Sequence, residues 1–164
     1  MESCLDPKRR ALCAAIALAS LLACAAAPVR KAEPPESRQV PYRAFVERSA
    51  RTHQLDPRLI LGLIEVESNF DPKARSRSGA HGLMQLMPET GRRFGARDFD
   101  DPAQNIEAGT SYMRYLVDLF GGDVDRAIAG YNVGEMAVFR AGGVPETAAV
   151  LHFVGAVKAA ARRY

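Results

Sequence analysis

The sequence has no excess of charge of one sign. Its 22 lysines and arginines are nearly balanced by 19 aspartates and glutamates, which leaves a formal net charge of +3 in 164 residues. The basic residues are scattered among the acidic ones, whereas nucleic-acid-binding domains concentrate them on one face. A nucleic acid is therefore not an expected partner.

Cysteine is also scarce, and long apolar runs are missing. The three cysteines all lie near the N-terminus: Cys4, Cys13 and Cys24. No apolar run reaches the ~18 residues that indicate a membrane-spanning helix. Because the cysteines are confined to the N-terminal segment, the domain that follows contains none and can form no disulfide. Its apolar core must therefore hold the fold alone.

The N-terminal segment has the pattern of a secretory signal. A basic stretch at residues 8–10 precedes a short apolar run at residues 11–23, and Leu-Leu-Ala-Cys ends at Cys24. Residues 1–23 are thus predicted to be a signal peptide. The Leu-Leu-Ala-Cys motif resembles the lipobox of bacterial lipoproteins, which predicts a lipidated Cys24 and a periplasmic protein anchored to the outer membrane. The alternative is an ordinary cut after one of the alanines at 25–27, which would remove Cys24.

Sustained alternation of apolar and polar residues, the mark of half-buried strands, is absent. Residues 24–40 are rich in Ala, Pro and charge and predict a linker. Residues 41–164 predict one mostly α domain with little or no sheet. Helices are expected after Asp56-Pro57, after Asp101-Pro102 and after Val144-Pro145, because proline favours the first helical position.

Two glutamates lie in the apolar stretch "RLILGLIEVES" at residues 58–68. At about 100° per residue, Glu67 shares a face with Ile60, Leu63 and Ile64, whereas Glu65 lies roughly 200° away and is expected to be a solvated surface charge. Burial raises the pKa of a carboxyl and keeps it protonated, as a general acid requires. The alternative for Glu67 is a half-buried carboxylate paired with an arginine, and spacing alone favours it.

Metal-binding patterns are missing as well. The three histidines are far apart and lack ligand spacing, and the aspartates at 98, 100 and 101 lack the remaining ligands of a calcium loop. No metal or cofactor is expected.

The polar residues outside the helices carry weak signals by themselves: Gln85 lies in an apolar run and needs hydrogen bonds, from backbone or from a ligand.

Taken together, the segments "LIEVESNFDPKARSRSGAHGLMQLMPETG" and "NIEAGTSYMRYLVDLFGGDVDRAIAGYNVGE" resemble a known family. They look like the soluble lytic transglycosylase (SLT) type of catalytic domain, which shares the goose-type lysozyme fold. The resemblance runs from about Leu59 to Gly134. It implies a lysozyme-like single domain that acts on the glycan strands of peptidoglycan.

The resemblance also implies roles for individual residues. Glu67 would be the catalytic acid, with Ser68 beside it at the helix end and Tyr131 near its carboxyl. Six residues, among them Ser68 and Tyr131, would line the substrate groove: Ser68, Ser76, Gln85, Met87, Tyr131 and Asn132. Two departures from the family pattern stand out. Gly130 replaces the usual alanine, and Val150 stands where a tyrosine is usual.

The implied reaction is cleavage of the β-1,4 bond between N-acetylmuramic acid and N-acetylglucosamine without water. Glu67 would protonate the bridging oxygen and then, ionised, accept the proton of the muramic C6 hydroxyl as a 1,6-anhydro ring closes. Most glycosidases need two carboxylates, whereas this reaction would use Glu67 alone. The alternatives are a lysozyme-like hydrolase and a non-catalytic peptidoglycan-binding or scaffold module of the cell envelope.

Overall fold

The computed structural model describes residues 40–164. The predicted signal peptide, Cys24 and almost all of the predicted linker lie outside the described residues. The described part forms seven helices: α2 (Arg43–Thr52), α3 (Pro57–Ser68), α4 (Pro88–Arg93), α5 (Pro102–Leu119), α6 (Val124–Val133), α7 (Glu135–Ala141) and α8 (Ala148–Ala161). Within it there is no strand, only isolated bridges between His81 and each of Arg75 and Leu86. The predicted mostly α class is therefore confirmed.

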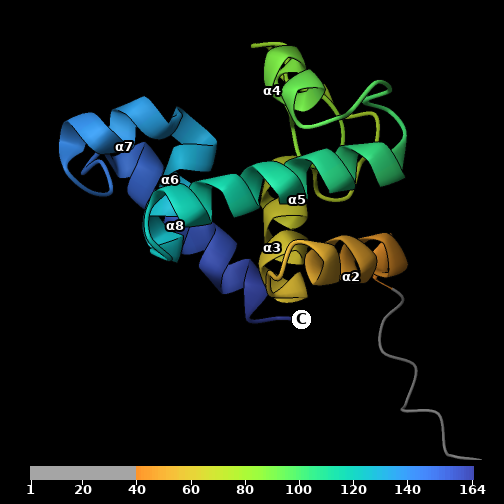
Figure 1. Ribbon diagram of the computed structural model, residues 1–164, viewed down its shortest axis with the longest axis horizontal. Helices are drawn as coiled ribbons and strands as arrows, with labels where there is room; N and C mark the ends of the chain where they lie inside the picture. Colours follow the sequence, from red (N-terminus) through yellow and green to blue (C-terminus); the bar gives the residue numbers. More distant parts are fainter. Residues whose placement is uncertain (1–39) are drawn as a thin grey trace, which may run out of the picture. The chain divides into compact units, whose positions relative to one another are not determined.

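Helix α3 forms the centre of the domain. It packs against α2 and α8, and α5 crosses nearby (Figure 1). Its residues from Leu59 to Ile64 are all buried. At Gly62 a side-chain carbon would lie only 2.8 Å from the backbone of Val157 and of Ala161, so the glycine lets α8 approach α3 closely.

Two predicted helix starts are confirmed, and in each the aspartate before the proline caps the helix. The side chain of Asp56 accepts a hydrogen bond from the backbone N–H of Arg58, and that of Asp101 accepts one from Gln104. In both helices a proline follows the cap, where its missing N–H costs nothing. Helix α5 ends at Leu119, before the glycines at 121 and 122.

The predicted start of the last helix at Pro145 is wrong. Helix α8 begins at Ala148, because the hydroxyl of Thr147 accepts the backbone N–H of Val150 and caps the helix there. Val144 has no side-chain acceptor and cannot cap a helix beginning at the proline. Val150, at the position of the usual tyrosine, is 3% exposed.

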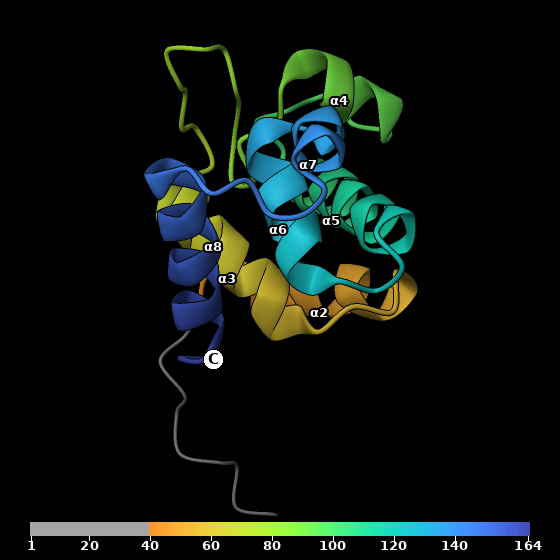
Figure 2. The same ribbon diagram turned by 90° about the vertical axis from the view of Figure 1, so that its left-hand side faces the viewer.

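The loop between α3 and α4 extends beyond the C-terminal end of α3 (Figure 2). It carries most of the polar residues that the sequence singles out, and it is the longest connection without a helix between residues 40 and 164. In this part of the chain no helix is both long and apolar enough to cross a bilayer. The end of α3 and this loop together carry most of the predicted site residues.

Candidate active site

Glu67 lies in the last turn of α3, where the chain turns sharply. Asn69 and Phe70 both take left-handed backbone conformations, with φ of 48° and 65°. Two such residues in succession stop the helix and send the chain away from it. The carboxyl of Glu67 is thus at the end of a rigid helix, beside the start of the loop.

The carboxyl of Glu67 has neither a hydrogen-bond partner nor an ion pair among residues 40–164. It is partly buried, and burial raises its pKa from 4.5 to about 7. A carboxyl with this pKa holds a proton near neutral pH and can also release it. That is the behaviour required of a group that acts first as an acid and then as a base.

Glu65 is not the solvated surface charge that its helical phase predicted. Its carboxylate accepts hydrogen bonds from Arg163 and from the hydroxyl of Tyr164, the latter at 2.6 Å. Partial burial would raise the pKa of Glu65, but the bonds from Tyr164 and Arg163 outweigh it and lower the pKa below its usual value. The paired, half-buried glutamate of this helix is therefore Glu65, and the unpaired one is Glu67.

Tyr131 lies next to Glu67 from the end of α6. Its hydroxyl donates to the carbonyl oxygen of Met84 at 2.8 Å. Burial raises the pKa of Tyr131 well above its usual value, and the charge of Glu67 raises it further. Tyr131 therefore stays protonated, and its single donor hydrogen is engaged by the Met84 carbonyl.

Helix α3 and the loop are also joined through Ser68. Its hydroxyl lies 3.0 Å from the carbonyl of Ile64, one turn earlier in the helix, and 2.7 Å from the carbonyl of Leu83 in the loop. The second contact fixes the loop against the helix end next to Glu67. The Ser68 hydroxyl is thus directed at backbone oxygens of the helix and the loop.

Asn105, for which the sequence pattern predicted no role, anchors the same loop from α5. It is completely buried. Its side-chain oxygen accepts the N–H of Met84 at 2.8 Å, and its amide donates to the carbonyls of His81 and Phe99. The signal for this role was a lone asparagine on the apolar face of a predicted helix, since such a group requires partners.

A missing side chain at Gly82 makes this anchor possible. A carbon added there would lie 2.3 Å from the Asn105 amide nitrogen and 2.4 Å from the carbonyl oxygen of Phe99. Gly109 does the same for the Met84 side chain, whose sulfur would be 2.5 Å from an added carbon. The glycines therefore let the loop lie directly on α5.

Of the other predicted groove residues, Ser76, Gln85 and Met87 lie in this loop and Asn132 lies at the end of α6. Ser76 is exposed, and its hydroxyl accepts the N–H of Ala80. Gln85 donates to two backbone carbonyls within the loop. Met87 is 45% exposed at the start of α4, and Asn132 is exposed after Tyr131. Met87 and Asn132 have surface available for a ligand, whereas Gln85 stiffens the loop.

The acidic cluster before α5 has structural partners. Asp101 caps α5, Asp98 accepts the N–H of Asp100, and Asp100 pairs with Arg75 at 2.6 Å. Within residues 40–164 no group of three or more His, Cys, Asp or Glu side chains is arranged to hold a metal ion.

The sequence of residues 45–150, more than half of the chain, matches the transglycosylase SLT domain family. The chain belongs to this family. The resemblance found in the sequence is thereby confirmed. Within the SLT domain, the residues described above lie at the end of α3, in the loop after it, in α5 and at the end of α6.

Curated relatives of this SLT domain carry related names. A transglycosylase of Enterobacteria phage PRD1 is 43% identical over 82 residues, which cover 50% of this chain and 31% of the phage protein. The membrane-bound lytic murein transglycosylase C of Actinobacillus pleuropneumoniae serotype 5b is 36% identical over 123 residues, 64% of this chain and 34% of that protein. The chain thus spans about a third of the length of these relatives.

Two solved structures share the fold. One is an inactive glutamate-to-glutamine mutant of the lytic transglycosylase Slt from Pseudomonas aeruginosa, with a TM-score of 0.66, 29% identity and coverage of 75% of this chain and 24% of that one. The 70 kDa soluble lytic transglycosylase of Escherichia coli gives 0.68 and 26%, covering 73% and 23%. The predicted lysozyme-like fold is confirmed.

Proposed function

We propose that this SLT domain is a peptidoglycan lytic transglycosylase in which Glu67 is the single catalytic carboxyl. The observation that carries the proposal is the isolation of the Glu67 carboxyl: it is partly buried, has no partner among the described residues, and has a pKa of about 7. The names of the relatives support the reaction class. So does the inactive Slt mutant, in which one glutamate is replaced by glutamine.

In the proposed reaction, protonated Glu67 donates to the oxygen between N-acetylmuramic acid and N-acetylglucosamine, and the bond to the muramic anomeric carbon breaks. The substrate's acetamido group stabilises the positive centre that develops. Ionised Glu67 then accepts the proton of the muramic C6 hydroxyl, whose oxygen closes onto the anomeric carbon. The carboxyl ends protonated again, so atoms and charge balance without water.

The surroundings of Glu67 support both steps. Desolvation favours the protonated carboxyl that is needed first. The Tyr131 hydroxyl donates its one hydrogen to the Met84 carbonyl, and in the proposal it turns from that carbonyl to donate to the ionised carboxyl of Glu67. Ser76, Met87 and Asn132 are proposed as glycan contacts on the exposed side, with Gln85 and Ser68 holding the loop that presents them.

Product mass tests the proposal. Purified peptidoglycan incubated with the protein should release fragments lighter by one water than the hydrolytic products, because the muramic end carries the anhydro ring. Fragments with a reducing end would instead identify a lysozyme-like hydrolase. Wall binding without any released fragment would identify a non-catalytic module.

The matched variants are Glu67→Gln and Glu65→Gln, the same chemical change two residues apart in α3. Glu67→Gln should abolish release while circular dichroism shows a folded domain. Glu65→Gln should retain release, because that carboxylate contacts the C-terminal residues. A folded and active Glu67→Gln protein would refute the assignment.

We also propose that the chain is exported and lipid-anchored through Cys24, facing the periplasm at the outer membrane. The Leu-Leu-Ala-Cys pattern supports this, and two relatives are named as membrane-bound. Cys24→Ala should move the protein from the membrane fraction to the soluble fraction. Unchanged membrane retention would contradict lipidation at this residue.

A further inference from the structure

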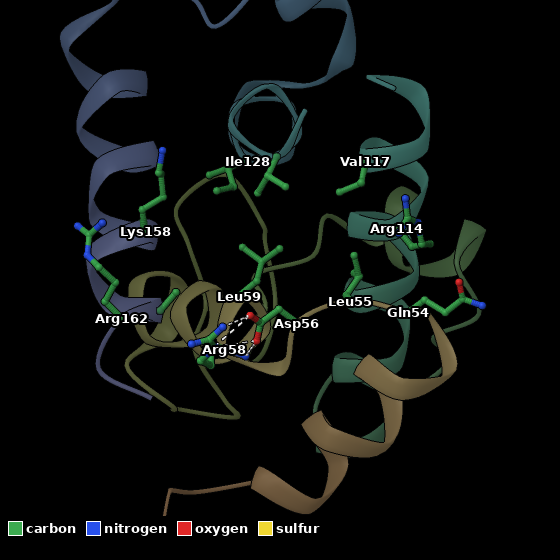
Figure 3. A pocket seen from close by; sticks show the side chains of 12 residues that line it. Gln54, Leu55, Asp56, Arg58, Leu59, Arg114, Val117, Ile128, Lys158 and Arg162 are labelled. Carbon is green, nitrogen blue, oxygen red and sulfur yellow. Dashed lines mark hydrogen bonds and ion pairs between the residues drawn. The ribbon is translucent and has the colours of Figure 1, made fainter. Parts of the chain in front are cut away.

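A cavity of about 530 Å³ lies at the N-terminal end of α3, where Leu55 and Leu59 line it (Figure 3). The residues of α3 from Ile60 to Ile64 are all buried and separate this cavity from Glu67. It is therefore not part of the candidate site. The side chains that can influence the Glu67 carboxyl are instead those packed around its neighbour, Tyr131.

Tyr131 packs against Tyr112, a residue of α5. The two ring centroids lie 5.2 Å apart with 38° between the ring planes, which is within the range of favourable aromatic pairs. The Tyr112 ring also lies 5.1 Å from that of Phe94, at the end of α4. A continuous series of ring contacts thus joins α4, α5 and α6: Phe94, Tyr112 and Tyr131.

Gly130 allows α6 to approach α5 at this point. A side-chain carbon added there would lie 3.0 Å from the Phe120 ring and 3.4 Å from Leu116. Ordinary carbon contacts are about 3.5–4.0 Å. Alanine, the residue usual in the family at this position, would therefore require Phe120 or α6 to shift. Because Tyr131 follows Gly130 directly, the close approach brings the Tyr131 ring to Tyr112.

Tyr112 is too deeply buried to act on a ligand directly. It is 9% exposed, and its hydroxyl lies 3.5 Å from the carbonyl oxygen of Gly130, which is longer than a normal O–H···O hydrogen bond. The ring, rather than the hydroxyl, is therefore the part of Tyr112 that constrains its neighbours. Its effect on chemistry at Glu67 has to pass through Tyr131.

The Tyr131 hydroxyl needs a fixed position in the proposed reaction. Its oxygen lies 2.8 Å from the carbonyl oxygen of Met84. In the proposal its hydrogen turns from Met84 to ionised Glu67 by rotation about one C–O bond. This rotation serves the reaction only while the oxygen stays within hydrogen-bond reach of both acceptors, which requires a ring that does not move.

We propose that Tyr112 is a positioning residue for the reaction: its ring holds that of Tyr131, so that the Tyr131 hydroxyl can serve the Met84 carbonyl and Glu67 in turn. Asn105 and Tyr112 are seven residues apart and therefore share one face of α5. From that face Asn105 fixes Met84 and Tyr112 fixes Tyr131. Helix α5 thus sets the distance between the hydroxyl and its first acceptor. This inference rests on the proposed function.

Hydroxyl exchange tests the contact without requiring catalysis. In protein labelled with ¹³C at the tyrosine Cζ atoms, the deuterium isotope shift of each Cζ signal reports how fast that hydroxyl hydrogen exchanges with water. Tyr112→Leu should accelerate exchange at Tyr131 about tenfold, because the hydrogen bond to Met84 opens more often once the ring contact is lost. Tyr112→Phe keeps the ring and should leave this exchange unchanged.

The matched control is Tyr115→Leu, the same change one turn later in α5. The Tyr115 ring lies 6.4 Å from Tyr112 and 5.7 Å from Phe94, so this variant disturbs the same aromatic cluster without removing the ring that contacts Tyr131. Exchange at the Tyr131 hydroxyl should therefore be the same as in the unmodified protein.

Cleavage kinetics test the role in the reaction. Tyr112→Leu should lower kcat about tenfold, whereas Tyr112→Phe should stay within about twofold of the unmodified protein. In a Tyr131→Phe background, Tyr112→Leu should change kcat by less than about twofold, because the hydroxyl that Tyr112 positions is gone. Circular dichroism checks that each variant is folded, and Tyr112→Met replaces the leucine variant if that protein does not fold.

The outcomes separate this inference from the proposed function. A loss of kcat that is equal in both backgrounds, or equal in Tyr112→Leu and Tyr115→Leu, would show that Tyr112 acts through general packing and would overturn the inference. Unchanged hydroxyl exchange at Tyr131 in Tyr112→Leu would overturn it too. Absence of cleavage by the unmodified protein would refute the proposed function alone, since hydroxyl exchange is measured without substrate.

Discussion

Replacing Glu67 by glutamine should stabilise the domain at pH 8 and leave its stability at pH 4 unchanged. Burial raises the pKa of Glu67 from 4.5 to about 7 in the folded protein. At a pH between 4.5 and about 7, the folded state holds a proton on Glu67 that the unfolded chain releases. The free energy of unfolding contributed by this group therefore falls as the pH rises, and above pH 7 the full cost of an ionised, desolvated carboxylate is present.

The size of the effect follows from the pKa difference. Each pKa unit corresponds to about 1.4 kcal/mol, so ionised Glu67 costs about 3 kcal/mol of folding free energy at pH 8. Glutamine is neutral at every pH and avoids this cost. For a domain of this size the melting temperature of Glu67→Gln at pH 8 should exceed that of the unmodified protein by about 10 °C.

Urea unfolding followed by circular dichroism at pH 4, 6 and 8 measures the difference between the two proteins. All other groups titrate alike in both, so their contributions cancel in the difference. Glu65→Gln serves as the control with the opposite sign: the pKa of Glu65 is lowered by its partners, so this variant should lose stability at neutral pH and the loss should fade as the pH falls. A difference between Glu67→Gln and the unmodified protein that is the same at all three pH values would refute the burial argument.

Three further variants test other parts of the site. Tyr131→Phe removes the hydrogen bond to Met84 and should lower the rate of muropeptide release while the domain stays folded; an unchanged rate across the pH profile would exclude a role near the carboxyl. Asn105→Ala leaves the N–H of Met84 and the carbonyl of Phe99 without a partner, while the His81 carbonyl keeps the N–H of Leu86, and should cost about 2–4 kcal/mol in urea unfolding; exposed Asn132→Ala should change stability by less than about 0.5 kcal/mol. Gly62→Ala should destabilise by about 1–3 kcal/mol, because its methyl group would push α3 and α8 apart; an unchanged denaturation midpoint would show that the helices can separate freely.

The sequence was sufficient for the long helices because their signals are local. The Asp-Pro pairs at 56 and 101 start α3 and α5, and the helical period then places Glu67 on the same face as the buried residues. Helices α2, α4 and α7 received no individual prediction. They are short, and none of them has a side chain that caps its first turn.

The remaining features depend on contacts between distant parts of the chain. Glu65 was wrongly expected in solvent because its partner Tyr164 lies 99 residues later, beyond the reach of any helical pattern. Asn105 could be recognised as a buried polar residue, but its partners in the loop could not be identified from spacing. The ring contacts that join Phe94, Tyr112 and Tyr131 likewise link three helices, and no helical pattern reveals them.

The packing of α8 against α3 also has a consequence for how the protein is made. The two helices are separated by about 80 residues, so closing the chain between them carries a large entropic cost that local contacts do not offset. During synthesis the groove beside Gly62 stays open to water until α8 has emerged. The helix that presents Glu67 is therefore enclosed late, and the domain remains incompletely folded until its final helix is available.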